Sequence, residues 1–265
     1  MRGASARSAM RHVPRKRFGQ HFLVDEAAIA AVVAAIAPQP RERLVEIGPG
    51  LGALTRPLSA RLEHLHAIEL DRDIIARLRT ELPAARVTLH AGDALRFDFG
   101  ALGPRLRVVG NLPYNISTPL LFHLAQHAAA ILDIHVMLQK EVVERMVAAP
   151  STSAYGRLSV MLQYRFDMEK LLDVPSAAFR PAPRVESAVL RMTPFVRLPH
   201  PARDETAFGK IVAAAFSQRR KTLRNALRDH FRGADFEKLG VDAGLRAQDL
   251  RVEDFVRLAD EVLTR

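Results

Sequence analysis

The chain has 265 residues, 48% of them apolar, and contains no cysteine. This length can bury a sizeable core in one large domain or two unequal ones, and the lack of cysteine excludes disulfides, thiolate zinc sites and cysteine nucleophiles. The net charge of +10 and the isoelectric point near 10.7 favour a polyanionic partner, although an arginine-rich, lysine-poor composition also arises from a GC-rich genome.

The first residues of the chain, MRGASARSAMRHVPRKR, lack the apolar segment of a signal peptide. They are rich in Arg and Ser and contain no acid, so a transit peptide is an alternative to the interpretation we prefer, a basic and flexible arm over residues 1–18. No apolar stretch approaches the roughly 18 residues that a membrane span needs, and the histidines show no metal-like spacing. We therefore expect a cytoplasmic protein without a metal.

Short apolar runs then alternate with amphipathic, helix-like stretches such as ALTRPLSARL and RDIIARLRTEL. This rhythm predicts an α/β fold with a doubly wound, mostly parallel sheet. The expected strands are 43–48, 64–70, 86–92, 106–112, 134–139 and a late pair around 171–175 and 186–192.

The segment 193–205 contains three prolines and is typical of a linker. Beyond it the periodicity is helical, through 206–231, 235–240 and 252–265. We therefore expect a small all-α domain at the C-terminal end, with boundaries at 19–195 and 196–265.

The sequence LVEIGPGLGALT places a glycine-rich turn between a strand and a helix. Glycines allow backbone amides to approach a ligand, and a helix N-terminus favours anionic groups. Gly48, Gly50 and Ala53 satisfy the relaxed dinucleotide fingerprint. By itself such a loop can also be a tight turn that binds nothing.

Two acidic residues at successive strand ends indicate which ligand the glycine loop binds. Glu69 closes the second strand, where a carboxylate can accept both ribose hydroxyls, and Asp93 closes the third, where it could accept from an adenine amine. Each alone would more often be a capping residue. Together they favour an adenosine ligand, either NAD or S-adenosylmethionine.

The fourth strand ends in GNLPYN, beside the expected adenosine pocket. Asn and Pro are common turn residues and Tyr114 could be a core aromatic, so a simple turn is one interpretation. The other is chemical. The lone pair of an adenine amine is delocalised into the ring, and a site that accepts hydrogen bonds from both N–H groups frees it for attack.

We expect the Asn111 side-chain oxygen and the Leu112 carbonyl to be those two acceptors. Pro113 disfavours helical geometry at Leu112 and has no competing N–H. Tyr114 offers a face on which a flipped base can stack and ring electrons that favour the charge developing on nitrogen. No strong general base is required, because the methylated amine can lose its proton to water.

Nine motifs, in this order along the chain, carry a resemblance to a known family. They are GQHFLVD, VEIGPGLGALT, IELDRD, GDAL, GNLPYNIST, LQKEVVERM, YGRLSV, AFRPAPRVESAV and FSQRRKTLRNAL. Over nearly its whole length the chain closely resembles the small-subunit ribosomal RNA adenine dimethyltransferases of the KsgA type. The NLPY motif is more specific than the glycine loop.

The resemblance implies a Rossmann-like class I methyltransferase sheet, S-adenosylmethionine as donor, and dimethylation of two adjacent adenosines near the 3′ end of 16S rRNA in the small ribosomal subunit. It places donor contacts on His21, Leu23, Gly48, Glu69, Asp93 and Asn111, to which the glycine loop adds Gly50. His21 departs from the usual Asn; an imidazole can still donate or accept one hydrogen bond, but not both at once as an amide can. Phe179 resembles the second stacking aromatic of the family, which would hold the base against Tyr114. Nothing requires more than a monomer.

Two basic clusters are candidates for RNA contact. The first is RHVPRKR, with Arg15, Lys16 and Arg17 immediately before the donor-binding segment. The second is RRKTLRNALR, in which Arg220, Arg224 and Arg228 recur every four residues on one face of an expected helix, with Arg219 and Lys221 beside them. Such a face is often only solvated, but a ribosomal substrate supplies phosphates.

Two other functions are weighed against the methyltransferase. One is a ribosome-assembly factor that binds the immature small subunit without needing to methylate it. The other is an NAD-dependent oxidoreductase, which the glycine loop alone would allow.

Overall fold

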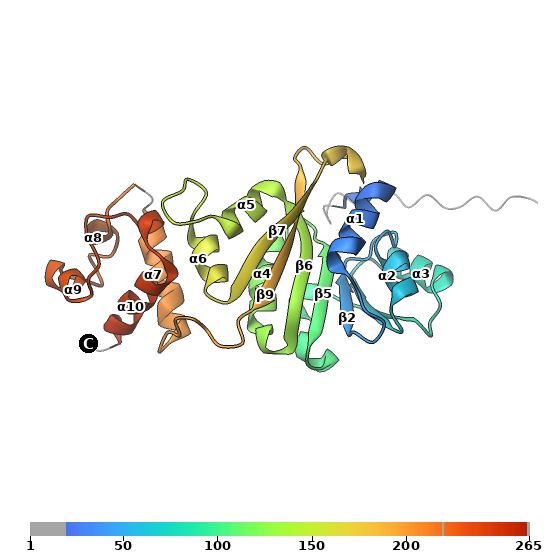
Figure 1. Cartoon of the computed structure of the whole chain (residues 1–265), viewed down its shortest axis with the longest axis horizontal. Coiled ribbons are helices and arrows are strands. Elements are labelled where there is room, and N and C mark those ends of the chain that lie inside the picture. The colour runs from blue at the N-terminus through green and yellow to red at the C-terminus, as the bar shows by residue number, and fades with distance from the viewer. Residues whose placement is uncertain (1–19, 219, 264–265) are drawn as a thin grey trace, which may run out of the picture.

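A seven-stranded sheet forms the centre of the larger part of the molecule (Figure 1). The structure is a computed structural model that describes residues 20–218 and 220–263. The strand order is β4-β3-β2-β5-β6-β9-β7, in which β4 to β6 are parallel while β9 and β7 are antiparallel. The strands are β2 (Leu44–Ile47), β3 (Leu65–Glu69), β4 (Val87–Ala91), β5 (Leu106–Asn111), β6 (Ile131–Gln139), β7 (Phe166–Val174) and β9 (Ser187–Pro194).

Helices cover both faces of this sheet, which confirms the predicted doubly wound α/β fold. The helices are α1 (Glu26–Ile36), α2 (Thr55–Arg61), α3 (Arg72–Glu81), α4 (Ser117–Gln126), α5 (Lys140–Val147) and α6 (Arg157–Gln163). Side chains alternate along β2, so Val45 and Ile47 pack with α4, α5 and α6, whereas Leu44 packs with α1 and α2.

One predicted strand is longer than expected. The strand placed at 171–175 begins at Phe166, because β7 pairs with β9 from Phe166–Pro194 to Val174–Ser187. Charged residues at several positions of β7 conceal the strand in the sequence, and an edge strand can expose them to solvent.

A second, two-stranded sheet fixes the start of the described chain. β1 (Phe22–Leu23) pairs antiparallel with β8 (Phe179–Arg180). The backbone amides of Val24 and Asp25 both donate to the Ala178 carbonyl, and the Asp25 side chain caps α1 by accepting from the Ala28 amide. The segment that contains His21 is therefore held beside the carboxyl edge of the main sheet.

The C-terminal part is helical, as expected, but its helices are shorter. They are α7 (Glu205–Ser217), α8 (Leu223–Ala226), α9 (Gly233–Lys238) and α10 (Val252–Val262). The prediction of one helix carrying Arg220, Arg224 and Arg228 on one face is wrong, since only Arg224 is helical. Thr222 forms a β-bridge with Arg246, and the Leu223 and Arg224 amides donate to the carbonyls of Leu245 and Ala243. These bonds to a distant segment replace the bonds that would continue α7.

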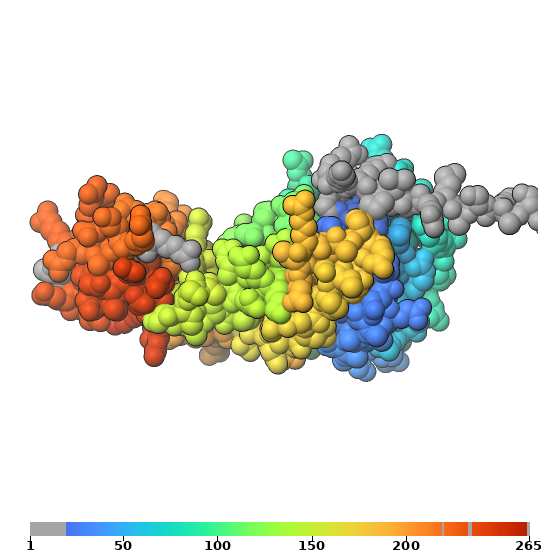
Figure 2. Space-filling view, turned by 90° about the horizontal axis from the view of Figure 1, so that it is seen from above, coloured from blue at the N-terminus to red at the C-terminus, as the bar shows by residue number. Residues whose placement is uncertain are grey.

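A second apolar core joins this helical part to the sheet-bearing part. It contains Phe208 and Val212 of α7 and Phe255 of α10, and it also takes Val160 and Tyr164 from α6 and its C-terminal end. Figure 2 shows the orange and red C-terminal segment abutting the yellow-green region. The division at 195/196 remains a prediction. No helix within 20–218 and 220–263 is long and apolar enough to cross a membrane.

Candidate active site

A cavity of about 200 Å³ opens at the carboxyl edge of the parallel strands. It lies where β2, β3, β4 and β5 end, the usual position for ligands in an open α/β sheet. All the donor-contact positions expected from the sequence line it, and so do the four residues of the NLPY motif. These residues are His21, Leu23, Gly48, Gly50, Glu69, Asp93, Asn111, Leu112, Pro113 and Tyr114.

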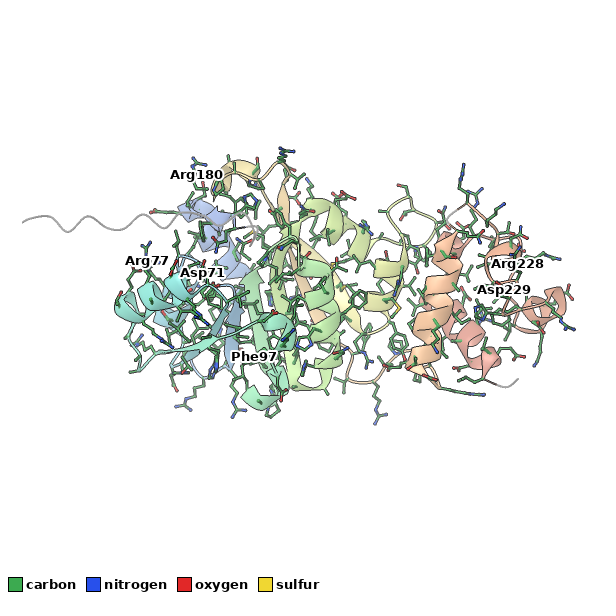
Figure 3. The ribbon with its side chains drawn as sticks, turned by 180° about the vertical axis from the view of Figure 1, so that it is seen from behind. Asp71, Arg77, Phe97, Arg180, Arg228 and Asp229 are labelled. Atoms are coloured by element: carbon green, nitrogen blue, oxygen red, sulfur yellow. The ribbon has the colours of Figure 1, made fainter. Side chains whose placement is uncertain are left out.

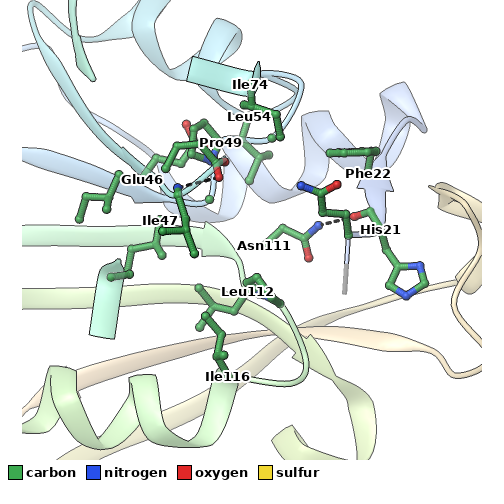
Figure 4. Close-up of a pocket in the computed structure, with 18 of the residues that line it drawn as sticks. His21, Phe22, Glu46, Ile47, Pro49, Leu54, Ile74, Asn111, Leu112 and Ile116 are labelled. Carbon is green, nitrogen blue, oxygen red and sulfur yellow. Dashed lines mark hydrogen bonds between the residues drawn. The ribbon is translucent and has the colours of Figure 1, made fainter. Parts of the chain in front are cut away.

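The glycine loop after β2 forms one wall of this cavity. Gly48 and Gly50 have φ angles of +68° and +54°, a region that residues with a Cβ rarely adopt. A Cβ at Gly50 would also lie only 3.1 Å from the ring of Phe22. The two glycines therefore let the loop turn tightly while the β1 segment lies directly over it (Figure 4).

Glu69 presents a carboxylate whose position is fixed by the backbone. Its Oε1 accepts from the amides of Leu70 and Asp71 at 2.8 and 2.9 Å, and the Gly50 amide lies near this carboxylate. Burial raises the pKa of Glu69. The neighbouring amides lower it, and the negative charge of Asp71 raises it further. Such a fixed acceptor suits the two hydroxyls of a ribose.

Asp93 caps a short helical turn and also lines the cavity. Its Oδ1 accepts from the Leu95 amide at 3.0 Å and so caps the short helical turn Ala94–Arg96. The residue is half-buried and lines the cavity. Capping by one oxygen therefore coexists with a place at the cavity wall.

The amide of Asn111 is oriented by the chain that crosses above it. Its Nδ2 donates to the His21 carbonyl at 2.9 Å, so the side-chain oxygen is left as an acceptor (Figure 4). The Leu112 amide donates to the Met137 carbonyl, whereas no backbone amide of the described residues donates to the Leu112 carbonyl. Two adjacent acceptors thus remain available at the end of β5.

The ring of Tyr114 is fixed by a hydrogen bond of its hydroxyl group, and the His21 ring covers one of its faces. Its hydroxyl shares a hydrogen bond of 2.7 Å with the buried Ser187 hydroxyl of β9, and burial raises its pKa. The His21 ring stacks on it with centroids 5.6 Å apart and an interplanar angle of 27°. The Nδ1–H of His21 in turn donates to the Pro181 carbonyl at 2.8 Å.

Phe179 is placed differently from the prediction. Its side chain is 0% exposed and belongs to the core cluster that contains Leu23 and Val189, and it does not line the cavity. Alternation on β8 explains this, because Phe179 points inward where Arg180 points outward. The aromatic partner of Tyr114 in this structure is His21 instead.

Comparison with known proteins identifies the family to which this site belongs. Residues 11–263 match the family model described as ribosomal RNA adenine dimethylase. The chain belongs to this family. It is therefore related by sequence to a group of methyltransferases that act on adenine in ribosomal RNA, and the predicted recognition is confirmed.

Curated relatives and solved structures agree with this assignment. The chain is 64% identical to "Ribosomal RNA small subunit methyltransferase A" of Thiobacillus denitrificans, over 96% of this chain and 100% of the relative. It is 60% identical to the protein of the same name from Chromobacterium violaceum, over 95% and 97%. A dimethyladenosine transferase from Plasmodium falciparum has the same fold, with a TM-score of 0.75, 24% identity and coverage of 90% and 96%.

The 23S rRNA methyltransferase ErmE is similar as well, with a TM-score of 0.71 and 25% identity over 92% of this chain and 100% of that one. This likeness extends through the helical part, because nearly the whole chain is covered. The class I methyltransferase fold expected from the sequence is thus confirmed for this family member.

Two residues of the site were not singled out from the sequence. Glu46 lies on β2, 2% exposed, and lines the cavity; an acid inside the apolar run RLVEIG was the available signal. Gly110 begins the GNLPYN motif, and a Cβ there would lie 2.5 Å from the Ile47 carbonyl oxygen on the neighbouring strand. Only the strand pairing reveals that close approach.

The expected RNA-contact residues divide into two groups. Arg220, Lys221, Arg224 and Arg228 are exposed, and Arg228 pairs loosely with Asp229 at 3.6 Å. Arg15, Lys16, Arg17 and Arg219 lie outside the described residues. Figure 3 places Arg228 at the opposite end of the molecule from Asp71, which follows β3. The described members of the second cluster therefore do not border the cavity.

Proposed function

We propose that this family member transfers methyl groups from S-adenosylmethionine to the exocyclic amines of two adjacent adenosines near the 3′ end of 16S rRNA. The observation that carries this proposal is the pair of acceptors at the end of β5. Asn111 lines the cavity and its nitrogen donates to the His21 carbonyl, which leaves its oxygen as an acceptor, and the Leu112 carbonyl beside it receives no backbone hydrogen bond from the described residues.

The residues around the cavity fit S-adenosylmethionine. Three acidic residues line it, Glu46, Glu69 and Asp93, and among the described residues no Lys or Arg does. Such a lining suits a positively charged ligand and disfavours the pyrophosphate of NAD. When bound, this donor supplies a methyl group on a positively charged sulfonium.

The chain's own residues act on the amine. Hydrogen bonds from its two N–H groups to the Asn111 oxygen and the Leu112 carbonyl draw the nitrogen toward sp³ geometry and free its lone pair. The Tyr114 ring, held by Ser187, offers a face to the base. Alignment and electrostatic stabilisation then supply most of the rate, and the proton of the methylated amine passes to water.

The ribosomal partner follows from the relatives and from charge. The curated relatives carry the name of a small-subunit rRNA methyltransferase, and Arg220, Lys221, Arg224 and Arg228 present exposed cations at the helical end. We propose that this end contacts phosphates of the small subunit while the cavity receives one base at a time. A monomer and a cytoplasmic location are part of the same proposal.

The test replaces Asn111 and measures both the methylation of the small subunit and the affinity for it. Asn111→Ala should abolish methylation of small subunits that lack these methyl groups, while the affinity for the subunit is retained. Gln126→Ala is the matched control, since it removes an exposed amide at the end of α4 that does not line the cavity. Labelled donor and mapping of the modified nucleotides give the first measurement, and co-sedimentation gives the second.

Normal dimethylation by Asn111→Ala would refute this account of the amine. Retained growth and subunit maturation in cells that carry only the inactive variant would instead favour the assembly-factor alternative. A calorimetric titration with both ligands decides the oxidoreductase alternative: tight NAD binding without any response to S-adenosylmethionine would end the methyltransferase proposal.

A further inference from the structure

Glu46 is a buried carboxyl group for which the proposed reaction has no use. It lies in the middle of β2, opposite Ala67 of β3 and Val109 of β5. It is 2% exposed and lines the cavity, and its Oε2 has no hydrogen-bond partner among the described residues. The Thr55 hydroxyl is close enough to influence it, yet makes no hydrogen bond of normal geometry either.

Glu46 and Glu69 both line the cavity, but their carboxyl groups differ in the hydrogen bonds that they accept. Backbone amides of Leu70 and Asp71 donate to Glu69, which offsets part of the effect of burial on its pKa. No comparable set of donors from the described residues surrounds Glu46, whose Oε2 has no hydrogen-bond partner among them. Two carboxyl groups in one cavity but in different environments commonly differ in protonation state.

Within the part of the chain that the structure describes, no cation compensates Glu46. The titratable groups that share the cavity with Glu46 are His21, Glu69, Asp93 and the phenol of Tyr114, and no Lys or Arg of the described residues lines it. Arg56 on α2 lies next to Thr55, but its guanidinium donates to the Leu51 carbonyl and to Glu81. Burial, with a further contribution from the charge of Glu69, raises the pKa of Glu46 to about 7.

We propose that Glu46 is a further donor-binding residue, which holds a proton in the free enzyme and releases it to water when the positively charged end of S-adenosylmethionine enters the cavity. The inference rests on the proposed function, which supplies the donor. The exchange balances: a neutral acid and a cation become a carboxylate paired with that cation, and one proton passes to solvent.

The physical reason is the cost of an unpaired buried charge. A carboxylate without a partner is strongly disfavoured in an apolar site, so the empty cavity keeps Glu46 neutral. A cation brought in by the ligand removes that penalty and favours the ionised form. Donor affinity and protonation of Glu46 are then linked, and each must change the other.

Isothermal titration calorimetry of the whole protein measures this linkage. Titrations with S-adenosylmethionine at pH 6, in two buffers of different ionisation enthalpy, give the number of protons exchanged, and we expect close to one released per donor. Between pH 5 and pH 7 the dissociation constant should fall by up to about tenfold per pH unit. The range ends at pH 7 because an α-amino group such as that of the donor titrates at about 7.7–8.0.

Two matched controls test whether the released proton comes from Glu46 and whether the positive charge of the donor drives its release. Glu46→Gln keeps the shape of the neutral acid, and it should bind the donor without proton release and with little dependence on pH. The probe 5′-methylthioadenosine retains the adenosine part but lacks both positive charges, so the unaltered protein should bind it without releasing a proton.

The outcomes separate this inference from the function on which it rests. Donor binding without proton release, or equal release by Glu46→Gln, overturns the role of Glu46 and leaves the methyltransferase proposal intact. Equal release with 5′-methylthioadenosine also overturns it, because no cation then drives the exchange. Failure of the donor to bind at any pH overturns the proposed function and the inference together.

Discussion

The glycine that begins the GNLPYN motif offers a sharp test of how the sheet positions the site. Gly110 lies on β5 beside β2, and a Cβ at this position would meet the Ile47 carbonyl oxygen at 2.5 Å and the Ile47 carbonyl carbon and nitrogen at 3.3 Å. These are backbone atoms of a buried parallel strand, so no side-chain rotation relieves the contact. Gly110→Ala must therefore push β5 away from β2.

Overpacking of this kind typically costs about 1–3 kcal/mol, and the reduced freedom of the unfolded chain returns only about 0.4–1 kcal/mol. Each kcal/mol lost lowers the melting temperature of a protein of this size by about 2–4 °C. Because Asn111 is the next residue, the displacement also moves its oxygen, and misplacement by about 1 Å can reduce a rate roughly 100-fold.

Differential scanning calorimetry measures the first effect, and methylation well below the melting temperature measures the second. Gly209→Ala is the control: a Cβ there lies 3.7 Å from the Met161 methyl carbon, an ordinary contact, and the site is inside α7. Alanine is the better helix former, so this variant should be more stable by roughly 0.5–1 kcal/mol. If Gly110→Ala melts at the wild-type temperature and methylates normally, the argument from strand contact is refuted.

Three further predictions concern the carboxylate of Glu69, two histidines of β3 and β4, and two exposed arginines of the helical part. Glu69→Ala should weaken S-adenosylmethionine binding by up to about 1.5–3 kcal/mol for each hydrogen bond lost; unchanged affinity by calorimetry would show that the ribose lies elsewhere. Burial and neighbouring imidazoles lower the pKa of His66 and His90, so in the unfolded chain these two imidazoles bind more protons below about pH 6.5 than in the folded chain. The free energy of unfolding of the wild type, measured relative to that of His66→Gln, should therefore fall from pH 7 to pH 5. A difference between the two proteins that does not change with pH in denaturant unfolding would contradict this. Charge reversal at Arg220 and Arg224 should weaken RNA binding and flatten its salt dependence, whereas an unaltered slope would leave these side chains as solvated surface.

The sequence by itself determined the parallel sheet and most of the cavity wall. Alternating strands and helices predict the fold because parallel strands must be connected by crossovers that cover both faces. Residues at strand ends, such as Glu69, Asp93 and Asn111, then meet at one edge whatever the details of packing. Their order in the chain is enough to place them around one ligand.

Tertiary structure decided whatever depends on contacts between distant segments. Phe179 is buried because β8 pairs with β1, and His21 takes the place beside Tyr114. The basic segment after α7 breaks because its amides bond to residues 243 and 245, which no local periodicity encodes. Glu46 in an apolar strand became informative only when the cavity beside it was seen to lack a compensating cation among the described residues.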